Sequence, residues 1–133
     1  MPPTIKPLIV VAGIIRNSKG QILLGQRRPG THLEGLWEFP GGKVEANETL
    51  EQALKRELEE ELGIQVSTSQ PLITVEHQYP EKKVLLYVLE VSNWLGEVQS
   101  LEQQVLQWVN PENLSKIKMP EADIPVVRLL QRI

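Results

Sequence analysis

Hydrophobic residues fall into short runs along the chain, and residues typical of turns separate these runs. The first run, residues 5–16, is rich in Ile and Val, as a buried strand would be. Gly20 can adopt the positive φ that closes a hairpin, so residues 21–26 are expected to form the returning strand. A loop over residues 28–36 follows. The predicted strands span residues 5–16, 21–26, 37–39, 72–78, 83–91 and 105–109.

The clearest helical spacing lies between Thr49 and Leu62. Thr49 and Gln52 have the spacing of a capping box, with Asn47 as a rival cap. Gly63 stands where a left-handed C-terminal cap is expected. The apolar face of this helix comprises Leu50, Ala53, Leu54, Leu58 and Leu62.

The C-terminal segment predicts a second, shorter helix. It begins near Asp123, tolerates Pro125 in its first turn and ends at Gln131. No internal repeat or linker-like stretch divides the chain. Strands accompanied by two helices predict a mixed α/β fold, in one domain that covers residues 1–133.

Composition and charge narrow the class of protein. The 133 residues carry a formal net charge of −3, which disfavours a nucleic-acid-binding surface because neutralising phosphates requires clustered Lys and Arg. The chain has no cysteine, which excludes disulfides, thiolate metal sites and cysteine nucleophiles. Its longest apolar run, Leu8–Ile15, is shorter than the ~20 residues that span a bilayer. We therefore expect a cytoplasmic monomer that binds neither membranes nor nucleic acids.

Three carboxylates share one side of the predicted helix over residues 49–62. Glu57, Glu60 and Glu61 are spaced i, i+3 and i+4, so their side chains project together and repel one another. A solvated acidic face is the ordinary interpretation of such a cluster. The alternative is a site for a hard divalent cation, whose coordination by oxygen ligands would offset the repulsion. The helix by itself leaves both interpretations open.

Residues 42–64 read GKVEANETLEQALKRELEEELGI, which resembles the Nudix box, G-x5-E-x7-R-E-U-x-E-E-x-G-U with U aliphatic. Every specified position is filled, by Gly42, Glu48, Arg56, Glu57, Leu58, Glu60, Glu61, Gly63 and Ile64. The resemblance implies a Nudix-type α/β/α sandwich with a mixed sheet, the Nudix-box loop and helix, and a C-terminal helix. It also implies metal-assisted hydrolysis of a phosphoanhydride, with Mg²⁺, or alternatively Mn²⁺, as cofactor.

The same resemblance implies roles for the acidic residues. Glu57 is expected to act as general base and to bind the metal, which Glu60 and Glu61 also bind. The carbonyl of Gly41 is expected to face the metal as well. Glu102, in a later loop, is the candidate for an assisting carboxylate and further ligand. Its alternative is an ordinary exposed loop residue.

Arg56 and Glu48 admit two interpretations. Arg56 can reach back to hold Glu48 and so fix the loop that enters the helix, in a charge-assisted pairing. Alternatively, Arg56 contacts a substrate phosphate. The family resemblance favours the first, structural role for both residues.

The likeness extends beyond the Nudix box. The stretches VAGIIRNSKGQILLGQRR, WEFPGGK and MPEADIPVVRLL resemble the MutT-type 8-oxo-dGTP diphosphatases. This implies conversion of 8-oxo-dGTP to the monophosphate and pyrophosphate, which removes oxidised guanine nucleotides from the precursor pool. The alternatives are another nucleotide substrate, such as CTP, ADP-ribose or a dinucleoside polyphosphate, and a domain that only binds nucleotides. The complete acidic set argues against pure binding.

The MutT-type resemblance also implies a set of substrate contacts. Arg28 is expected at the phosphate or sugar with His32 nearby, and the Phe39 backbone at the base edge. Apolar walls for the base are assigned to Leu8, Val10 and Val84, although such residues are more often simple core. The expected substrate-binding set is Arg28, His32, Phe39, Gly41, Gly42, Tyr79, Val84 and Asp123.

Two members of this set have competing roles. Tyr79 could stack on the base or anchor a hairpin turn at the surface. Asp123 stands where the MutT type has Asn, which donates and accepts a hydrogen bond at once, whereas ionised Asp only accepts. Asp123 could accept from the N7 hydrogen of 8-oxoguanine, but it would also face the O6 acceptor unless burial protonates it. Its alternative role is to cap the last helix.

Overall fold

Seven strands and two α-helices make up the described part of the chain, residues 6–132 of the computed structural model. Ile5, the start of the predicted first strand, lies outside the described residues. The strands are β1 (Leu8–Ile15), β2 (Ile22–Gln26), β3 (Trp37–Glu38), β4 (Gly41–Lys43), β5 (Gln65–Gln78), β6 (Lys83–Leu95) and β7 (Leu106–Val109). The helices are α1 (Leu50–Leu62) and α2 (Ile124–Leu130), with 3-10 helices η1 (Pro111–Lys116) and η2 (Glu121–Asp123).

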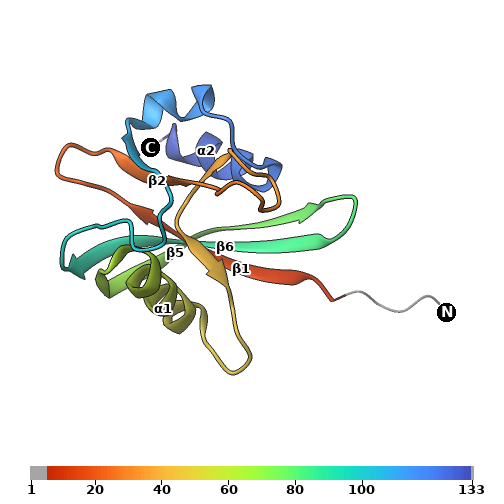
Figure 1. Cartoon of the computed structure of the whole chain (residues 1–133), viewed down its shortest axis with the longest axis horizontal. Helices are drawn as coiled ribbons and strands as arrows, with labels where there is room; N and C mark the ends of the chain where they lie inside the picture. Colours follow the sequence, from red (N-terminus) through yellow and green to blue (C-terminus); the bar gives the residue numbers. More distant parts are fainter. Residues whose placement is uncertain (1–5, 133) are drawn as a thin grey trace.

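The strands form two sheets. Four of them lie in the order β4-β1-β6-β5, with β1 parallel to β6 and the outer strands antiparallel to their neighbours. This is the mixed sheet that the sequence predicts. The second sheet is antiparallel and has the order β3-β2-β7. Figure 1 shows α1 on one side of the layer formed by β1, β5 and β6, and α2 with β2 on the other side.

The two helices cover opposite faces of β1, because side chains alternate along a strand. Val11 and Ile15 pack in the cluster that contains the apolar face of α1. Ala12 and Ile14 pack in the cluster that contains α2. All four side chains are 3% exposed or less, so β1 is buried on both faces. The expected α/β/α sandwich is confirmed, with the second sheet as an addition.

Helix α1 begins and ends at the predicted residues. Thr49 Oγ1 accepts a hydrogen bond from the Gln52 N–H at 3.1 Å, and Gln52 Oε1 accepts one from the Thr49 N–H at 2.9 Å. Asn47, the rival cap, has a φ of 67° and lies in the turn before the helix. Gly63 closes the helix with a φ of 70° and donates to the Glu59 carbonyl. Both ends of the helix that carries the acidic residues are therefore fixed.

Two strands are longer than predicted. β5 begins at Gln65 rather than Leu72, and β6 extends to Leu95 rather than Val91. Three register shifts interrupt the pairing of β5 with β6, and they break the alternation on which strand prediction relies. Pro71 is accommodated because β5 is an edge strand.

The other differences from the sequence prediction are strand ends and short elements. The structure gives Leu8–Ile15 for β1, starts β2 at Ile22, ends β3 at Glu38 and starts β7 at Leu106. The strand β4 and the two 3-10 helices were not predicted, and α2 begins at Ile124 and ends at Leu130, one residue inside each predicted bound. Among residues 6–132, none of the helices has the length and hydropathy needed to cross a membrane.

Candidate active site

The strand β4 brings the Nudix-box loop against α1. It pairs with β1 and also contacts α1. A Cβ atom at Gly41 would lie 2.0 Å from the carbonyl oxygen of Val11, and one at Gly42 would lie 2.5 Å from Cδ of Glu57. The two glycines therefore allow a close approach of the backbone, and they bring the loop backbone to the Glu57 carboxylate.

Alanine at these two glycines is expected to give different defects. Gly41→Ala places Cβ on a fixed backbone oxygen, so we expect the variant to lose most of its stability. Gly42→Ala meets only the end of a flexible side chain, so we expect it to fold, to displace the Glu57 carboxylate and to lower kcat roughly ten- to a hundredfold. Thermal unfolding and steady-state kinetics of both variants check this. A Gly42→Ala enzyme with wild-type kcat would contradict it.

Arg56 organises the charges around the loop. Its Nε lies 2.8 Å from Oε2 of Glu48 and its Nη2 lies 3.0 Å from Oε1, so the expected pairing is present and bidentate. This hydrogen bonding lowers the pKa of Glu48 to about 2. Arg56 also donates to the Lys43 carbonyl at 3.1 Å and to Oε1 of Glu57 at 3.0 Å. It thereby ties the loop to the helix and fixes the Glu57 side chain.

Glu57 and Glu61 lie where their charged forms are disfavoured. Burial raises the pKa of Glu57, Arg56 opposes the rise, and neighbouring carboxylates add to it. Burial, followed by the charges of Glu57, Glu102 and Glu38, raises the pKa of Glu61 to about 9. Within the described part of the chain, Oε2 of Glu61 is buried without a hydrogen-bond partner. A buried carboxylate oxygen of this kind requires a proton or a cation.

The donor set fits a divalent cation. Carboxylate and backbone oxygens are the ligands of hard cations, and a cation would offset the repulsion among these side chains. Across residues 6–132, no three His, Asp or Glu side chains are already grouped to hold a metal ion. Arg56 Nη1 lies 3.0 Å from Glu57 Oε1 and 3.5 Å from Glu60 Oε2, so its charge partly compensates both carboxylates. The metal ligands stay a prediction.

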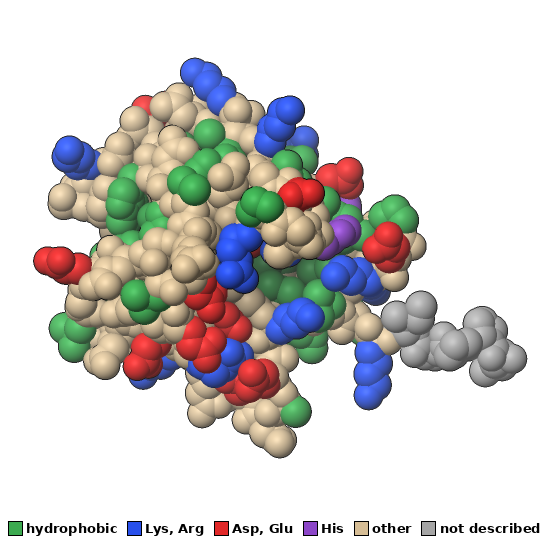
Figure 2. Space-filling model, in the orientation of Figure 1, with side chains coloured by type: hydrophobic (Ala, Val, Ile, Leu, Met, Phe, Trp, Pro, Cys, Tyr) green, Lys and Arg blue, Asp and Glu red, His purple; other side chains and the backbone are tan. Residues whose placement is uncertain are grey.

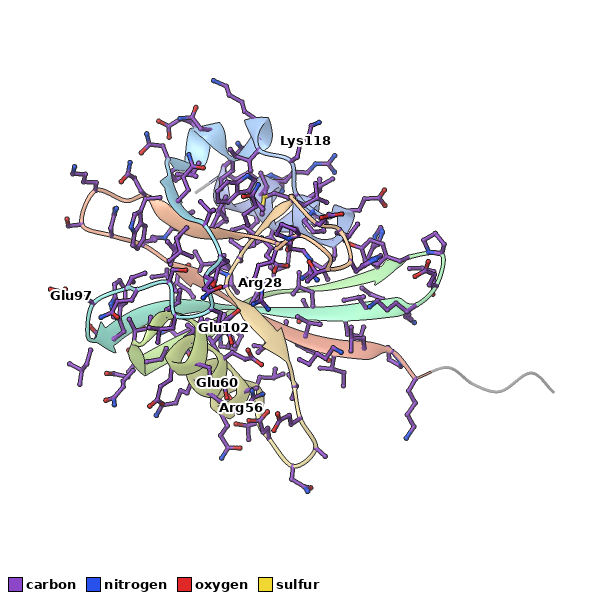
Figure 3. The ribbon with its side chains drawn as sticks, viewed as in Figure 1. Arg28, Arg56, Glu60, Glu97, Glu102 and Lys118 are labelled. Carbon is purple, nitrogen blue, oxygen red and sulfur yellow. The ribbon has the colours of Figure 1, made fainter. Side chains whose placement is uncertain are left out.

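Glu102 lies in a loop that is fastened to the C-terminal end of α1. The N–H of Leu101 donates to the Glu61 carbonyl at 2.9 Å, and the N–H of Gln99 donates to the Leu62 carbonyl at the same distance. Arg28 Nη1 donates to the Glu102 carbonyl at 3.2 Å. In Figure 3, Glu102 appears between Arg28 and the part of α1 that carries Glu60. The structure thus places the predicted assisting carboxylate beside the acidic helix.

Two neighbouring cavities lie next to this cluster. The smaller, which we call the acidic cavity, has a volume of about 170 Å³. Its lining includes Arg28, Glu61 and Glu102, whereas Glu57 and Glu60 do not line it. The larger, which we call the apolar cavity, has a volume of about 210 Å³. The two share the residues Arg27, Glu38 and Gly41.

The apolar cavity collects most of the predicted base contacts. Figure 2 shows a recess of hydrophobic side chains bordered by basic ones, with acidic side chains to one side. Phe39 is 3% exposed and Val84 is 8% exposed, so both are core residues as well as walls. The predicted residues that line this cavity are Leu8, Val10, His32, Phe39, Gly41, Gly42, Tyr79, Val84 and Asp123.

Asp123 is the buried charged residue of the described core, with 6% of its surface exposed. It precedes α2, but its side chain makes no capping hydrogen bond, so its interpretation as a helix cap is wrong. Burial, followed by the charge of Glu38, raises the pKa of Asp123 to about 8. The raised pKa favours the neutral carboxyl, which can donate and accept a hydrogen bond at once.

Among the residues that line these cavities, the sequence does not single out Arg27, Glu38 and Lys82. Arg27 donates to the His32 carbonyl and, through Nη1, to both oxygens of Glu38 at 3.2 and 3.3 Å. Lys82 lines the apolar cavity from the β5–β6 turn. Arg27 and Arg28 are adjacent in sequence, and the pairing of β2 with β3, which places Glu38 opposite Gly25, brings Glu38 within reach of Arg27. The available sequence signal for Arg27 is its place directly after β2, along which side chains alternate between the two faces.

Comparison with known proteins agrees with this site. A family model described as NUDIX domain matches residues 11–129. An 8-oxo-dGTP diphosphatase of Haemophilus influenzae is 42% identical over 125 residues, which cover 94% of this chain and 92% of the relative. A CTP pyrophosphohydrolase of Escherichia coli is 39% identical over 122 residues, with 92% and 90% covered. A structure from a study of MutT of Aliivibrio salmonicida and Vibrio cholerae is 38% identical, has a TM-score of 0.82 and covers 96% and 98%.

The chain belongs to the Nudix family, and it is a Nudix hydrolase. The matched region contains α1, the Glu102 loop and most residues of both cavities. Nudix hydrolases act on small nucleotide substrates and generally need a divalent metal ion.

Proposed function

We propose that this enzyme hydrolyses 8-oxo-dGTP to the monophosphate and pyrophosphate, and so removes an oxidised nucleotide from the precursor pool. The observation that carries this proposal is the apolar cavity with Asp123 in its wall, next to the acidic cavity. Because the cavities share Arg27, Glu38 and Gly41, a base in one leaves its phosphates at the other. A nucleoside triphosphate has this combination of an apolar ring and charged chain.

The divalent ion would be Mg²⁺, with Mn²⁺ as a substitute. The residues that would hold it are the Gly41 carbonyl, Glu57, Glu60, Glu61 and Glu102. When bound, such an ion neutralises phosphate charge and lowers the pKa of a coordinated water. We further propose that the enzyme works as a monomer in the cytoplasm.

The chain's own groups supply proton transfer and positioning. Glu57 would take the proton of the attacking water, and its raised pKa makes it a better base than an exposed carboxylate. Arg56 holds that carboxylate through the contact at 3.0 Å. Arg28 extends along the acidic cavity and would bind a phosphate, while its present contact keeps the Glu102 backbone close.

Base selection follows from the neutral carboxyl of Asp123. Its carbonyl oxygen can accept from the N7 hydrogen of 8-oxoguanine, while its hydroxyl donates to O6. Ordinary guanine presents acceptors at both N7 and O6, so one of the two bonds is lost. Phe39, which lines the same cavity, would contribute its backbone to the base edge.

CTP is the second candidate, because the same carboxyl fits cytosine. The N4 amino group of cytosine donates and its N3 accepts, which complements a neutral Asp as well as 8-oxoguanine does. The relative of Escherichia coli named CTP pyrophosphohydrolase supports keeping this candidate. Cavity size does not decide between the two bases, so substrate kinetics must.

A substrate panel tests the proposal. With Mg²⁺ present, we expect kcat/KM for 8-oxo-dGTP to exceed that for dGTP by at least roughly tenfold, the value of one mismatched hydrogen-bonding edge. The products should be the monophosphate and pyrophosphate, and a chelator should abolish turnover. CTP and ADP-ribose complete the panel. A maximum for CTP would establish the second candidate, and a maximum for ADP-ribose would overturn both.

A further inference from the structure

The segment that carries Asp123 is held by side chains from the β5–β6 hairpin. The hydroxyl of Tyr79 accepts a hydrogen bond from the Ala122 N–H at 3.1 Å. Two residues before Tyr79, Nε2 of His77 lies 2.9 Å from Oε2 of Glu121. Glu121, Ala122 and Asp123 together form η2, so two of its three residues are tied to the hairpin.

The Tyr79 hydroxyl caps the N-terminus of η2, which has no side-chain cap of its own. The first N–H groups of a helix have no partner within the helix, and the residue before η2, Pro120, makes no side-chain cap. Ala122 is 5% exposed, so water has little access to its N–H. Tyr79 therefore acts as a cap supplied from a distant part of the chain. Removing its hydroxyl leaves a buried donor unpaired.

The Tyr79 ring is itself fixed in orientation. The backbone N–H of Tyr79 donates to the Lys82 carbonyl at 2.8 Å, which closes the hairpin turn. Its ring packs edge-on against His77, with centroids 4.5 Å apart, and lies 6.5 Å from the ring of His32. Because the ring is fixed, its hydroxyl holds η2 in a defined position relative to the hairpin.

We propose that Tyr79 is a positioning residue for base recognition: its hydroxyl holds η2 so that the Asp123 carboxyl faces the base in the apolar cavity. This inference rests on the proposed function, because it assigns to Asp123 the reading of the base. It differs from stacking of the Tyr79 ring on the base, since it acts through Asp123. His77 supports it by orienting the ring and by pairing with Glu121.

Binding of nucleoside monophosphates in the absence of metal tests this proposal. Calorimetry gives Kd for 8-oxo-dGMP, dGMP and CMP with the wild type, Tyr79→Phe and Tyr87→Phe. Tyr87 is the chain's other tyrosine and lines neither cavity, so it is the matched control. We expect Tyr79→Phe to weaken 8-oxo-dGMP binding roughly fivefold, the value of one hydrogen bond, and to affect dGMP less. Tyr87→Phe should match the wild type.

A double variant separates positioning from direct contact. In an Asp123→Ala background, Tyr79→Phe should cause no further loss of 8-oxo-dGMP binding, because the group it positions is gone. An equal loss in both backgrounds would show direct contact with the base and overturn the proposal. Unchanged binding by Tyr79→Phe would also overturn it. Melting curves identify any unfolded variant. If Tyr79→Phe does not fold, His77→Asn, which loosens the ring but keeps the hydroxyl, should show a weaker loss of 8-oxo-dGMP binding than removal of the hydroxyl is expected to cause.

The wild-type measurement distinguishes this inference from the proposed function. If the wild type binds 8-oxo-dGMP no better than dGMP, the proposed base preference fails. The coupling between Tyr79 and Asp123 is then measured with the monophosphate that the wild type binds most tightly. Non-additive losses with that ligand would still support positioning, and additive losses would overturn it.

Discussion

Glu57→Gln is expected to lower kcat by about a thousandfold and to leave the fold intact. Glutamine has the same shape, so it keeps the contact with Arg56 and fits beside Gly42, but it cannot take a proton or bind a cation as a carboxylate does. Pyrophosphate release measures kcat, and thermal unfolding checks the fold. Turnover near the wild-type value would remove Glu57 from the chemistry.

The control for this variant is Glu59→Gln. Glu59 is exposed on the same helix, and the substitution removes the same charge two residues away. It lines neither cavity, so we expect kcat within about twofold of the wild type. Equal losses in the two variants would show that net charge, rather than the position of the Glu57 carboxylate, controls turnover.

The helix that carries the acidic residues could be predicted in full because its determinants are local. Thr49, Gln52 and Gly63 act within a turn of the residues they cap, so the sequence alone shows both helix ends. Strand β5 is different. Its first half is polar and includes Pro71, and only its pairing with β6 makes it a strand. Long-range pairing with bulges leaves no periodic pattern in the sequence.

The candidate site shows the same division between local and long-range determinants. The pairing of Arg56 with Glu48 spans eight residues, and the sequence predicts it. The contact of Tyr79 with Ala122 spans 43 residues, and the sequence only places Tyr79 in a turn. The protonation of Asp123 depends on burial between β3, the hairpin and η2, which no local pattern contains. Long-range packing therefore decides the surroundings of Asp123 in the apolar cavity, whereas the motif decides the acidic cluster.

Asp123→Asn is expected to change the response to pH. The pKa of Asp123 is about 8 in the folded protein, against an ordinary value of 3.8. Between about pH 4 and pH 8 the folded state keeps a proton that the unfolded chain has released. The contribution to the free energy of unfolding is fully present below about pH 4. It is lost as the pH rises towards 8, by at most ~1.4 kcal/mol per pH unit. Asn does not titrate, so Tm of the variant should rise relative to the wild type across this window.

The same substitution is expected to separate the two proteins in activity above pH 8. There the wild-type carboxyl ionises and loses the donor that faces O6, so its kcat/KM for 8-oxo-dGTP should fall, whereas the Asn amide keeps both donor and acceptor. Both proteins share the other titratable and charged groups of the cavity: Arg27, His32, Glu38, Lys43, Tyr79 and Lys82. A difference between the two profiles therefore reports on the residue at position 123. Tm and kcat/KM for 8-oxo-dGTP, measured from pH 5 to about pH 9, check both expectations. Parallel profiles would mean that Asp123 is ionised throughout, and base reading by a neutral carboxyl would be wrong.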